Sequence, residues 1–388
     1  MVEMQKLSRE DFASAAWTTV SEPGDELAGL LRLTLGAAKS LELLIERAPA
    51  VRISKLLQES EHAELAAVRF GKLTETIADG LERWLPRLSK TEVENALKVA
   101  AACRANFVSP EHEEWPSGLS DLGLAMPAGL WVRGSLERIA PALAIVGSRT
   151  ATSYGAWVCA EFVSALADRS VAVVSGGAFG IDAAAHRAAN ALGAPNFAVM
   201  AGGVDRFYPS SNNELLREVT ANGAVLAELP PGARPTRWRF LQRNRLIAAL
   251  GRATVVVEAG HRSGAINTAN HALAIGRNVG AVPGTINIAT SEGCHRLIRE
   301  GTAQLVASNA DLFELIGLSR TDTVDEEPMG ALELRALDAL TARFQNQVKL
   351  LEKAGLTSLE LAIALGALEL SGRAERDEHG FWRKRLNL

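Results

Sequence analysis

The stretch VAVVSGGAFGIDAAAHRAANAL, residues 171–192, holds one complete unit of the expected fold. Its first four residues are apolar and rich in valine, which is typical of a short buried strand. A glycine-rich turn follows at once, and residues 182–192 have the pattern of a helix. A strand, a tight turn and a helix in this order form the repeating unit of a parallel sheet that is covered by helices.

The same alternation continues on both sides of this stretch, from residue 143 to about residue 315. Helical segments, such as 156–168, 215–220 and 265–275, lie between most of the apolar runs. This pattern predicts an α/β fold with a doubly wound, mainly parallel sheet. The runs that we expect to form strands are 143–146, 171–174, 197–200, 224–227, 254–257, 279–282 and 304–306.

The two flanks of this central zone have different patterns. Residues 25–103 are helical throughout, and prolines and glycines punctuate an irregular connector over 108–141. Three helices over 332–340, 346–354 and 358–370 precede a hairpin, which is the layout of a winged helix. That module contacts DNA in many proteins and docks proteins in others. We predict an N-terminal helical domain (1–107), a central domain (108–318), an acidic linker (319–330) and a winged-helix-like domain (331–388).

Composition limits the classes of function. The chain has 388 residues, 47% of them hydrophobic, and a formal net charge of -4. It is therefore not a protein that coats nucleic acid by bulk charge, and any nucleic-acid site must be a local basic surface. Cys103, Cys159 and Cys294 lack the spacing of a zinc site or a disulfide framework, and the N-terminus is not a secretory signal. No long apolar run appears. We expect a cytoplasmic protein with no metal, no cofactor and no membrane span.

The predicted strand ends concentrate unusual residues. Ligands of a doubly wound sheet bind beyond the carboxyl ends of its strands. Gly147, Ser148 and Arg149 follow the first run, and residues 175–182 follow the second. Glycines in such loops present backbone N–H groups to an anion at a helix N-terminus. With the loops 201–209 and 258–264, they predict an anion-binding rim that could follow a phosphate backbone.

The segment RWRFLQRNR, residues 237–245, alternates arginines with aromatic residues just ahead of a predicted strand. Arginine offers a planar fork of donors to phosphate, and an aromatic ring offers a flat face to an unstacked base. The segment therefore suggests a groove for single-stranded nucleic acid. The alternative is a solvated helix face with Trp238 and Phe240 docked inward.

Candidates for catalysis are weaker. Asp182 and His186 stand at i, i+4 on one predicted helix, and Glu258 ends an apolar strand. Each also has a structural interpretation. Asp182 would cap a helix, His186 would be hydrogen-bonded beneath the loop, and Glu258 would bind loop amides or an arginine such as Arg245. We predict no catalytic residue and no enzymatic activity.

Many ordered motifs over residues 115–317 resemble the DNA-processing protein A family, also called Smf. The resemblance implies an extended Rossmann-like domain, a sterile-alpha-motif-like N-terminal domain and a C-terminal winged helix. It also implies single-stranded DNA binding, a homodimer, and loading of the RecA recombinase during natural transformation. The motifs are 145–149, 175–182 with His186, 205–209 with Asn212, 228–232, 243–245, 256–259 with 263–264, and 282–284 with 291–293.

The resemblance also implies which residues bind DNA. They lie in the predicted strand-end loops and in the arginine-rich segment. They are Gly147, Ser148, Arg149, Ser175, Gly176, Gly177, Phe179, Gly180, Arg237, Phe240, Arg243, Asn244, Arg245, Ser263 and Gly264.

A competing hypothesis keeps the fold and changes the function. Rossmann-like nucleotide phosphoribohydrolases also use a glycine-rich loop and an acid at a strand end. Glu258 or Asp182 would then act on a nucleoside monophosphate. The arginine-rich segment 237–245 favours DNA, because a pocket for a small nucleotide does not need it. A protein-interaction scaffold with a vestigial pocket is a third hypothesis.

Overall fold

The computed structural model describes residues 5, 7–318, 330–377 and 379–385. The chain forms two compact units, Met1–Ser319 and Arg320–Leu388. Residues 319–329 of the predicted acidic linker lie outside the described part. Within that part, no helix is long and apolar enough to cross a membrane.

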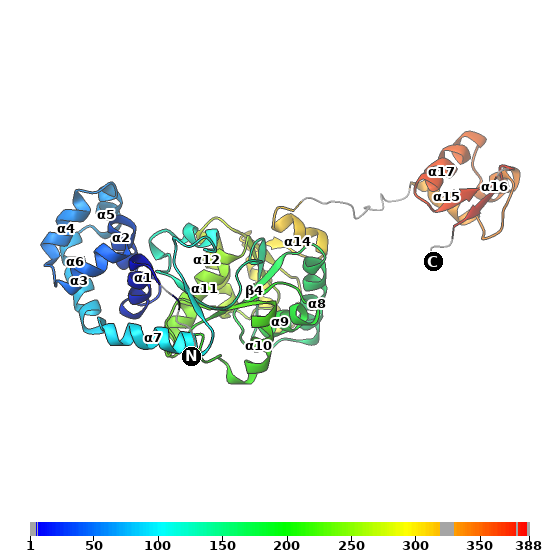
Figure 1. Cartoon of the computed structure of the whole chain (residues 1–388). Helices are drawn as coiled ribbons and strands as arrows, with labels where there is room; N and C mark the ends of the chain where they lie inside the picture. Colours follow the sequence, from blue (N-terminus) through cyan, green and yellow to red (C-terminus); the bar gives the residue numbers. More distant parts are fainter. Residues whose placement is uncertain (1–4, 6, 319–329, 378, 386–388) are drawn as a thin grey trace. The chain divides into compact units, whose positions relative to one another are not determined.

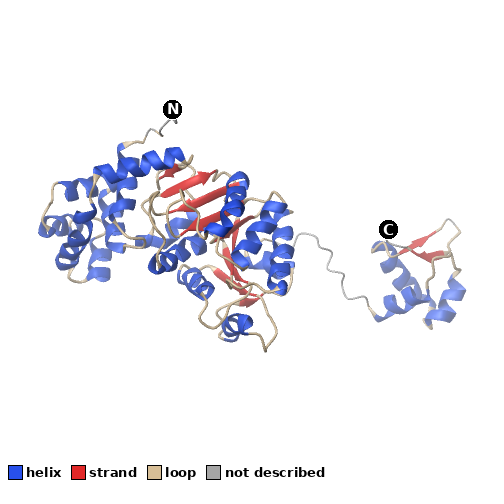
Figure 2. Cartoon of the chain, turned by 90° about the horizontal axis from the view of Figure 1, so that it is seen from below, coloured by secondary structure: helices blue, strands red, loops and turns tan. Residues whose placement is uncertain are grey.

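A nine-stranded sheet forms the centre of the first unit (Figures 1 and 2). Its strand order is β1-β2-β6-β5-β4-β3-β7-β8-β9, and all pairs from β6 to β9 along this order are parallel. This confirms the predicted α/β class with a mainly parallel sheet. The strands are β1 (Asn106–Val108), β2 (Leu130–Gly134), β3 (Ala142–Val146), β4 (Ala172–Ser175), β5 (Asn196–Met200), β6 (Gly223–Ala227), β7 (Ala253–Val256), β8 (Asn278–Ala281) and β9 (Gln304–Leu305).

Helices cover both faces of this sheet, because each central strand is apolar on both sides. On β3, Leu143 and Ile145 belong to one hydrophobic core, whereas Ala144 and Val146 belong to the other. The first core contains residues of α8 (Ser153–Ala167), α9 (Ile181–Ala191) and α14 (Asn309–Leu315). The second contains residues of α11 (Arg237–Leu250), α12 (Gly264–Ala274) and α13 (Glu292–Arg299). A further helix, α10 (Asn213–Asn222), packs on β5 and β6.

The strand order reverses between β3 and β7. From β3 the chain moves outward through β4, β5 and β6, and then returns to place β7 on the other side of β3. The loops that leave β3 and β7 therefore diverge to opposite faces of the sheet. An open sheet has its ligand-binding crevice at such a switch point.

The N-terminal helices pack around buried tryptophans. The rings of Trp17 and Trp84 meet edge to face, with centroids 5.5 Å apart. Trp131 of β2 donates a hydrogen bond from its Nε1 to Thr18, so this helical layer is also joined to the sheet. The helices are α1 (Arg9–Val20), α2 (Glu26–Leu35), α3 (Ala37–Ile45), α4 (Ala50–Gln58), α5 (Ala63–Phe70), α6 (Leu73–Trp84) and α7 (Lys90–Ala102).

Strands β1 and β2 lie at an edge of the sheet that the sequence did not indicate. The irregular connector predicted over 108–141 contains β2, and the predicted domain boundary at residue 107 falls inside β1. Both strands are short, and Pro127 and Gly129 precede β2. Their conformation depends on antiparallel pairing with each other and with β6, which is a long-range effect.

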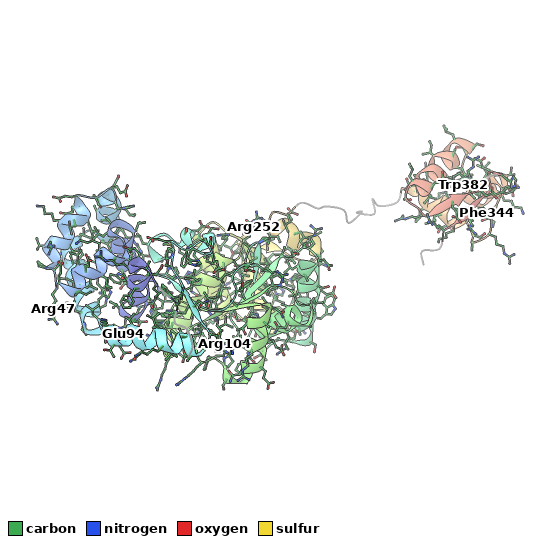
Figure 3. The ribbon with its side chains drawn as sticks, viewed as in Figure 1. Arg47, Glu94, Arg104, Arg252, Phe344 and Trp382 are labelled. Carbon is green, nitrogen blue, oxygen red and sulfur yellow. The ribbon has the colours of Figure 1, made fainter. Side chains whose placement is uncertain are left out.

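The second unit has the element order that the sequence predicts. Helices α15 (Ala331–Ala339), α16 (Gln347–Ala354) and α17 (Ser358–Leu370) precede an antiparallel hairpin of β10 (Ala374–Arg376) and β11 (Trp382–Lys384). Trp382 is buried in its core, and the Arg383 guanidinium lies 4.5 Å from the centroid of the Phe344 ring (Figure 3). A role as a winged helix stays a prediction.

Candidate nucleic-acid interface

A cleft of about 980 Å³ lies at the switch point of the first unit. One wall is the loop after β3, and another is the loop after β7 together with the first turn of α12. The first half of α11 closes the third side. Residues that line the cleft include Gly147, Ser148, Arg149, Ala178, Asp182, Tyr208, Thr236, Arg237, Phe240, Leu241, Arg243, Asn244, His261, Arg262, Ser263, Gly264, Asn267 and Thr268.

The loop after β3 has its shape because two glycines allow close packing. A Cβ on Gly147 would lie 2.5 Å from the Ile181 side chain. Gly180 has a φ of +76°, and a Cβ there would lie 2.1 Å from the carbonyl oxygen of Ser148. The backbone N–H of Ser148 donates to the carbonyl oxygen of Glu258 at 2.6 Å. These contacts fix the loop and leave Arg149 exposed at the rim.

The three candidate catalytic side chains have structural partners. The buried Glu258 carboxylate accepts hydrogen bonds from the backbone N–H and the hydroxyl of Thr152, and it does not line the cleft. Asp182 accepts from the amides of Gly176 and Ala178 at 3.2 and 3.3 Å. His186 is buried with its Nδ1 2.6 Å from Asn196 Oδ1, and burial lowers the pKa of its imidazole. These contacts agree with the structural interpretations.

The first half of α11 brings an aromatic ring into the cleft. Thr236 caps the helix by accepting a hydrogen bond from the amide of Arg239. One turn later, the half-buried ring of Phe240 lies 5.6 Å, centroid to centroid, from that of Tyr208. The guanidinium groups of Arg149 and Arg243 lie 5.5 and 5.7 Å from the centroid of the Phe240 ring. Phe240 is therefore neither a fully exposed side chain nor part of the hydrophobic core.

The second half of α11 is buried. Arg243 is 6% exposed, and its Nη1 donates to the carbonyl oxygens of Gly176 and Val199 at 2.6 and 2.5 Å. Burial lowers the pKa of Arg243 to about 10. Asn244 donates to Asn267 Oδ1 at 3.1 Å and so attaches α11 to α12. Both side chains line the cleft from below while they hold its walls together.

The structure corrects two of the expected DNA contacts. Arg245 is 2% exposed, does not line the cleft, and donates from Nη2 to both carboxylate oxygens of Glu228 at 2.6 Å. Its partner is thus Glu228 and not Glu258. Ser175 is fully buried, and its hydroxyl donates to the carbonyl oxygen of Ile145 at 2.6 Å. Neither side chain lies where DNA can reach it, so both have structural roles.

The other predicted site residues divide into two groups. Gly176, Gly177, Phe179 and Gly180 do not line the cleft, although the glycines shape the loop beneath it. A Cβ on Gly176 would lie 2.3 Å from Arg243 Nη1. The residues that do line it are Gly147, Ser148, Arg149, Arg237, Phe240, Arg243, Asn244, Ser263 and Gly264.

Several cleft residues were not singled out from the sequence, and two of them have side chains suited to bases or phosphates. Tyr208 and Arg262 stand in the loops after β5 and β7, and both loops belong to the predicted rim. The sequence feature that could have indicated them is an aromatic or cationic residue within a strand-end loop. Nothing local distinguishes them from neighbours such as Arg206, which does not line the cleft.

The electrostatic character of the cleft is positive. Arg149, Arg237 and Arg262 are exposed along it, and none of them forms an ion pair with a residue that the structure describes. The carboxylate of Asp182 also lines the cleft, but loop amides bind it. The N-terminus of α12, capped by Ser263, adds a partial positive charge. In the described part of the chain, no three His, Cys, Asp or Glu side chains are grouped to hold a metal ion.

A Rossmann-like sheet with a cationic, aromatic cleft at its switch point has the features of a site for a polyanion with flat groups. The family model for DNA recombination-mediator protein A matches residues 106–317. A Mycobacterium tuberculosis (strain CDC 1551 / Oshkosh) relative that carries the name DprA is 44% identical over 303 residues, covering 71% of this chain and 76% of the relative. The chain belongs to the DNA recombination-mediator protein A family, a family of DNA-processing proteins.

Solved structures agree with this assignment. The crystal structure of DNA processing protein A from Streptococcus pneumoniae matches with a TM-score of 0.61 and 28% identity, covering 80% of this chain and 98% of that one. The DNA processing protein A of Helicobacter pylori matches with a TM-score of 0.50 and 25% identity, over 54% of this chain and 94% of that one. The study of the latter concerns its mode of binding single-stranded DNA.

Proposed function

We propose that the cleft binds single-stranded DNA and that the protein acts as a recombination mediator by binding, without catalysis. The observation that carries this proposal is Phe240, a half-buried ring that lines the cleft, with the exposed Arg149 guanidinium 5.5 Å from its centroid. An aromatic ring stacks on an unpaired base, and an exposed guanidinium beside it binds a flanking phosphate.

The chemistry of the cleft favours a single strand over a duplex. The bases of a duplex are already stacked on one another, so a ring at the floor of a cleft has no free base face to meet. Stacking also tolerates any base, because every base has a π-face. The ligand is therefore a single strand of mixed sequence. The reported single-stranded DNA binding of the Helicobacter pylori relative supports this choice.

We further propose that the bound strand is protected and then passed to the RecA recombinase, as in natural transformation, and that the working form is a homodimer. Membership of a family of recombination mediators supports a role in recombination. A mediator should accelerate formation of RecA filaments on single strands, which can be measured as strand-dependent ATP hydrolysis by RecA. Sedimentation of the full chain at several concentrations measures the dimer.

Titration of fluorescent oligonucleotides by anisotropy, at several salt concentrations, tests the binding proposal. Single strands should bind more tightly than duplexes of the same sequence. Three free arginines line the cleft, and each phosphate contact on a single strand contributes about -0.7 to the log–log salt slope, so the slope should be about -2. Preference for duplex, or a slope near zero, would overturn the proposal.

The phosphoribohydrolase hypothesis gives a different result in a second assay. It requires Glu258 or Asp182 to act on a nucleotide, whereas Glu258 binds Thr152 and Asp182 binds two loop amides. We expect no release of free base from nucleoside monophosphates. We also expect Asp182→Asn and Glu258→Gln to leave DNA affinity largely unchanged. If the protein releases free base and Glu258→Gln abolishes this release, the phosphoribohydrolase hypothesis is favoured over the binding proposal.

A further inference from the structure

We infer that the path of single-stranded DNA continues beyond the cleft to a second stacking site, formed by Tyr154 and Trp157 on the first turns of α8. This inference rests on the proposed function and extends it. The cleft around Phe240 would bind one part of the strand. The Tyr154–Trp157 pair, which we call the α8 platform, would stack on bases further along the same strand.

The α8 platform is an exposed aromatic pair that the fold does not need. Tyr154 is 44% exposed and Trp157 is 59% exposed, with ring centroids 6.3 Å apart and an angle of 30° between the rings. The core-facing side of α8 is made by other residues, among them Val158 and Phe162. Large exposed apolar groups of this kind mark binding surfaces more often when they are grouped and fixed in position.

One of the two rings of the platform, Tyr154, is also held in position by a hydrogen bond. The Tyr154 hydroxyl donates to the carbonyl oxygen of Pro283 at 2.8 Å, which fixes its ring across the end of β8. Thr152, the N-cap of α8, is bound through its amide and hydroxyl to the buried Glu258. The loss of side-chain entropy when a base stacks on Tyr154 is correspondingly small.

The segment between cleft and platform is short and suited to phosphate. Arg149 lines the cleft, and the five residue steps from it to Tyr154 can span at most about 18 Å. Arg149 is free of ion pairs within the described part of the chain. The amides of Ser153 and Tyr154 begin α8 and have no acceptor within the helix. A strand that leaves the cleft past Arg149 therefore has these donors and Tyr154 of the α8 platform within about 18 Å along the chain.

A series of oligothymidylates of increasing length, from about 5 to about 20 nucleotides, tests this inference in the full-length protein. The shortest strands should occupy the cleft alone, and a further rise in affinity should appear once the strand reaches the α8 platform. Trp157→Ala should leave the affinity of short strands unchanged. It should lower the affinity of long strands about 5- to 140-fold, the range expected for one base–aromatic contact, with an unchanged salt slope.

Two matched variants separate stacking from other effects. Trp238→Ala removes a similarly exposed indole (55%) on α11 that does not line the cleft, and it should not change the length dependence. Trp157→Phe keeps a ring and should restore most of the lost affinity. Trp157 emission should also be quenched by long strands and not by short ones, so that Trp157→Phe removes this part of the quenching.

The outcomes distinguish this inference from the proposal on which it rests. If short strands bind at the cleft and affinity shows no step that depends on Trp157, the second site is wrong and the first stands. If Trp157→Ala changes sedimentation and leaves the length dependence intact, the platform is an interface between copies of this chain. If no single strand binds at all, both the proposed function and this inference are wrong.

Discussion

Two arginine-rich stretches of α11, residues 237–240 in its first half and 243–245 around its middle, have different roles. The first stretch contributes Arg237 and Phe240 to the cleft. The second stretch is buried, and its arginines bind Gly176, Val199 and Glu228. The comparison shows that the number of arginines in a segment does not predict how much of it can bind DNA. What matters is how many of its guanidinium groups the fold leaves without a partner.

The fold occupies most of these groups with distant acceptors. Arg239 forms hydrogen bonds with both carboxylate oxygens of Glu22, 217 residues away in the chain, at 3.0 and 2.8 Å. Arg245 donates from Nη2 alone to both carboxylate oxygens of Glu228, 17 residues away in the chain. Among the arginines of α11, only Arg237 is exposed without an ion pair in the described part of the molecule.

The largest expected effect is a loss of stability when the buried ion pair between Arg245 and Glu228 is removed. Arg245→Met should lower the free energy of unfolding by about 3–5 kcal/mol, because it removes the ion-pair partner of the mostly buried Glu228 carboxylate. Denaturant unfolding measures this loss. The double variant with Glu228→Gln should recover part of the stability. Equal stability with weakened DNA binding would mean that Arg245 reaches DNA after all.

Arg149→Ala should weaken single-stranded DNA binding by about 1.5–3 kcal/mol, the cost of losing one charge-assisted hydrogen bond to phosphate. Its side chain is exposed at the rim, so the melting temperature should change little. A titration and a thermal scan on the same preparation compare the two effects. An unchanged affinity with a lower melting temperature would make Arg149 a structural residue.

Phe240→Ala should cost about 1–3 kcal/mol of affinity through lost stacking, with a salt slope close to that of the unmodified protein. Phe240→Tyr is the matched control, since it keeps the ring. A sharp drop in thermal stability with full DNA affinity would instead assign the ring to the core, together with Tyr208.

Arg237→Ala should have the opposite signature within the same half-helix. It removes one phosphate contact and no ring, so the log–log salt slope should become shallower by about 0.7. Affinities measured at four or more salt concentrations provide this slope. If the slope does not change, Arg237 does not contact phosphate.

The smallest effect concerns the contact between α11 and the N-terminal helices. Burial alone would raise the pKa of Glu22, but hydrogen bonds from Arg239 and Arg87 outweigh it and lower the pKa below 4.5. The contribution of Glu22 to stability is therefore complete above its unfolded pKa and is lost as the pH falls through the lower folded value. Glu22→Gln should flatten the acid side of the stability curve. A curve that keeps its shape would argue that this pair does not couple to folding.

Much of the fold could be predicted because its signals are local. Each parallel strand is a short apolar run of its own, and helical patterns such as 156–168 and 265–275 lie between these runs. Strand β2 was not predicted from the sequence, because its three apolar residues form a strand only through pairing with β6. For the site, Arg149 and Phe240 were predicted from residue type and from their place after a strand or before one, and both line the cleft. Arg245 and Ser175 were misassigned because their partners, Glu228 and the Ile145 carbonyl, lie outside any local pattern.

Photochemical cross-linking of the full-length protein to a single strand that carries 5-iodouracil tests the central claim most directly, because the probe reacts with the aromatic residue on which it stacks. The cross-linked peptides should contain Phe240 or Tyr208, and Phe240→Ala should remove the first of these. Cross-links confined to residues 330–385, with Phe240 and Tyr208 unmodified, would contradict the account and place the DNA site outside the cleft.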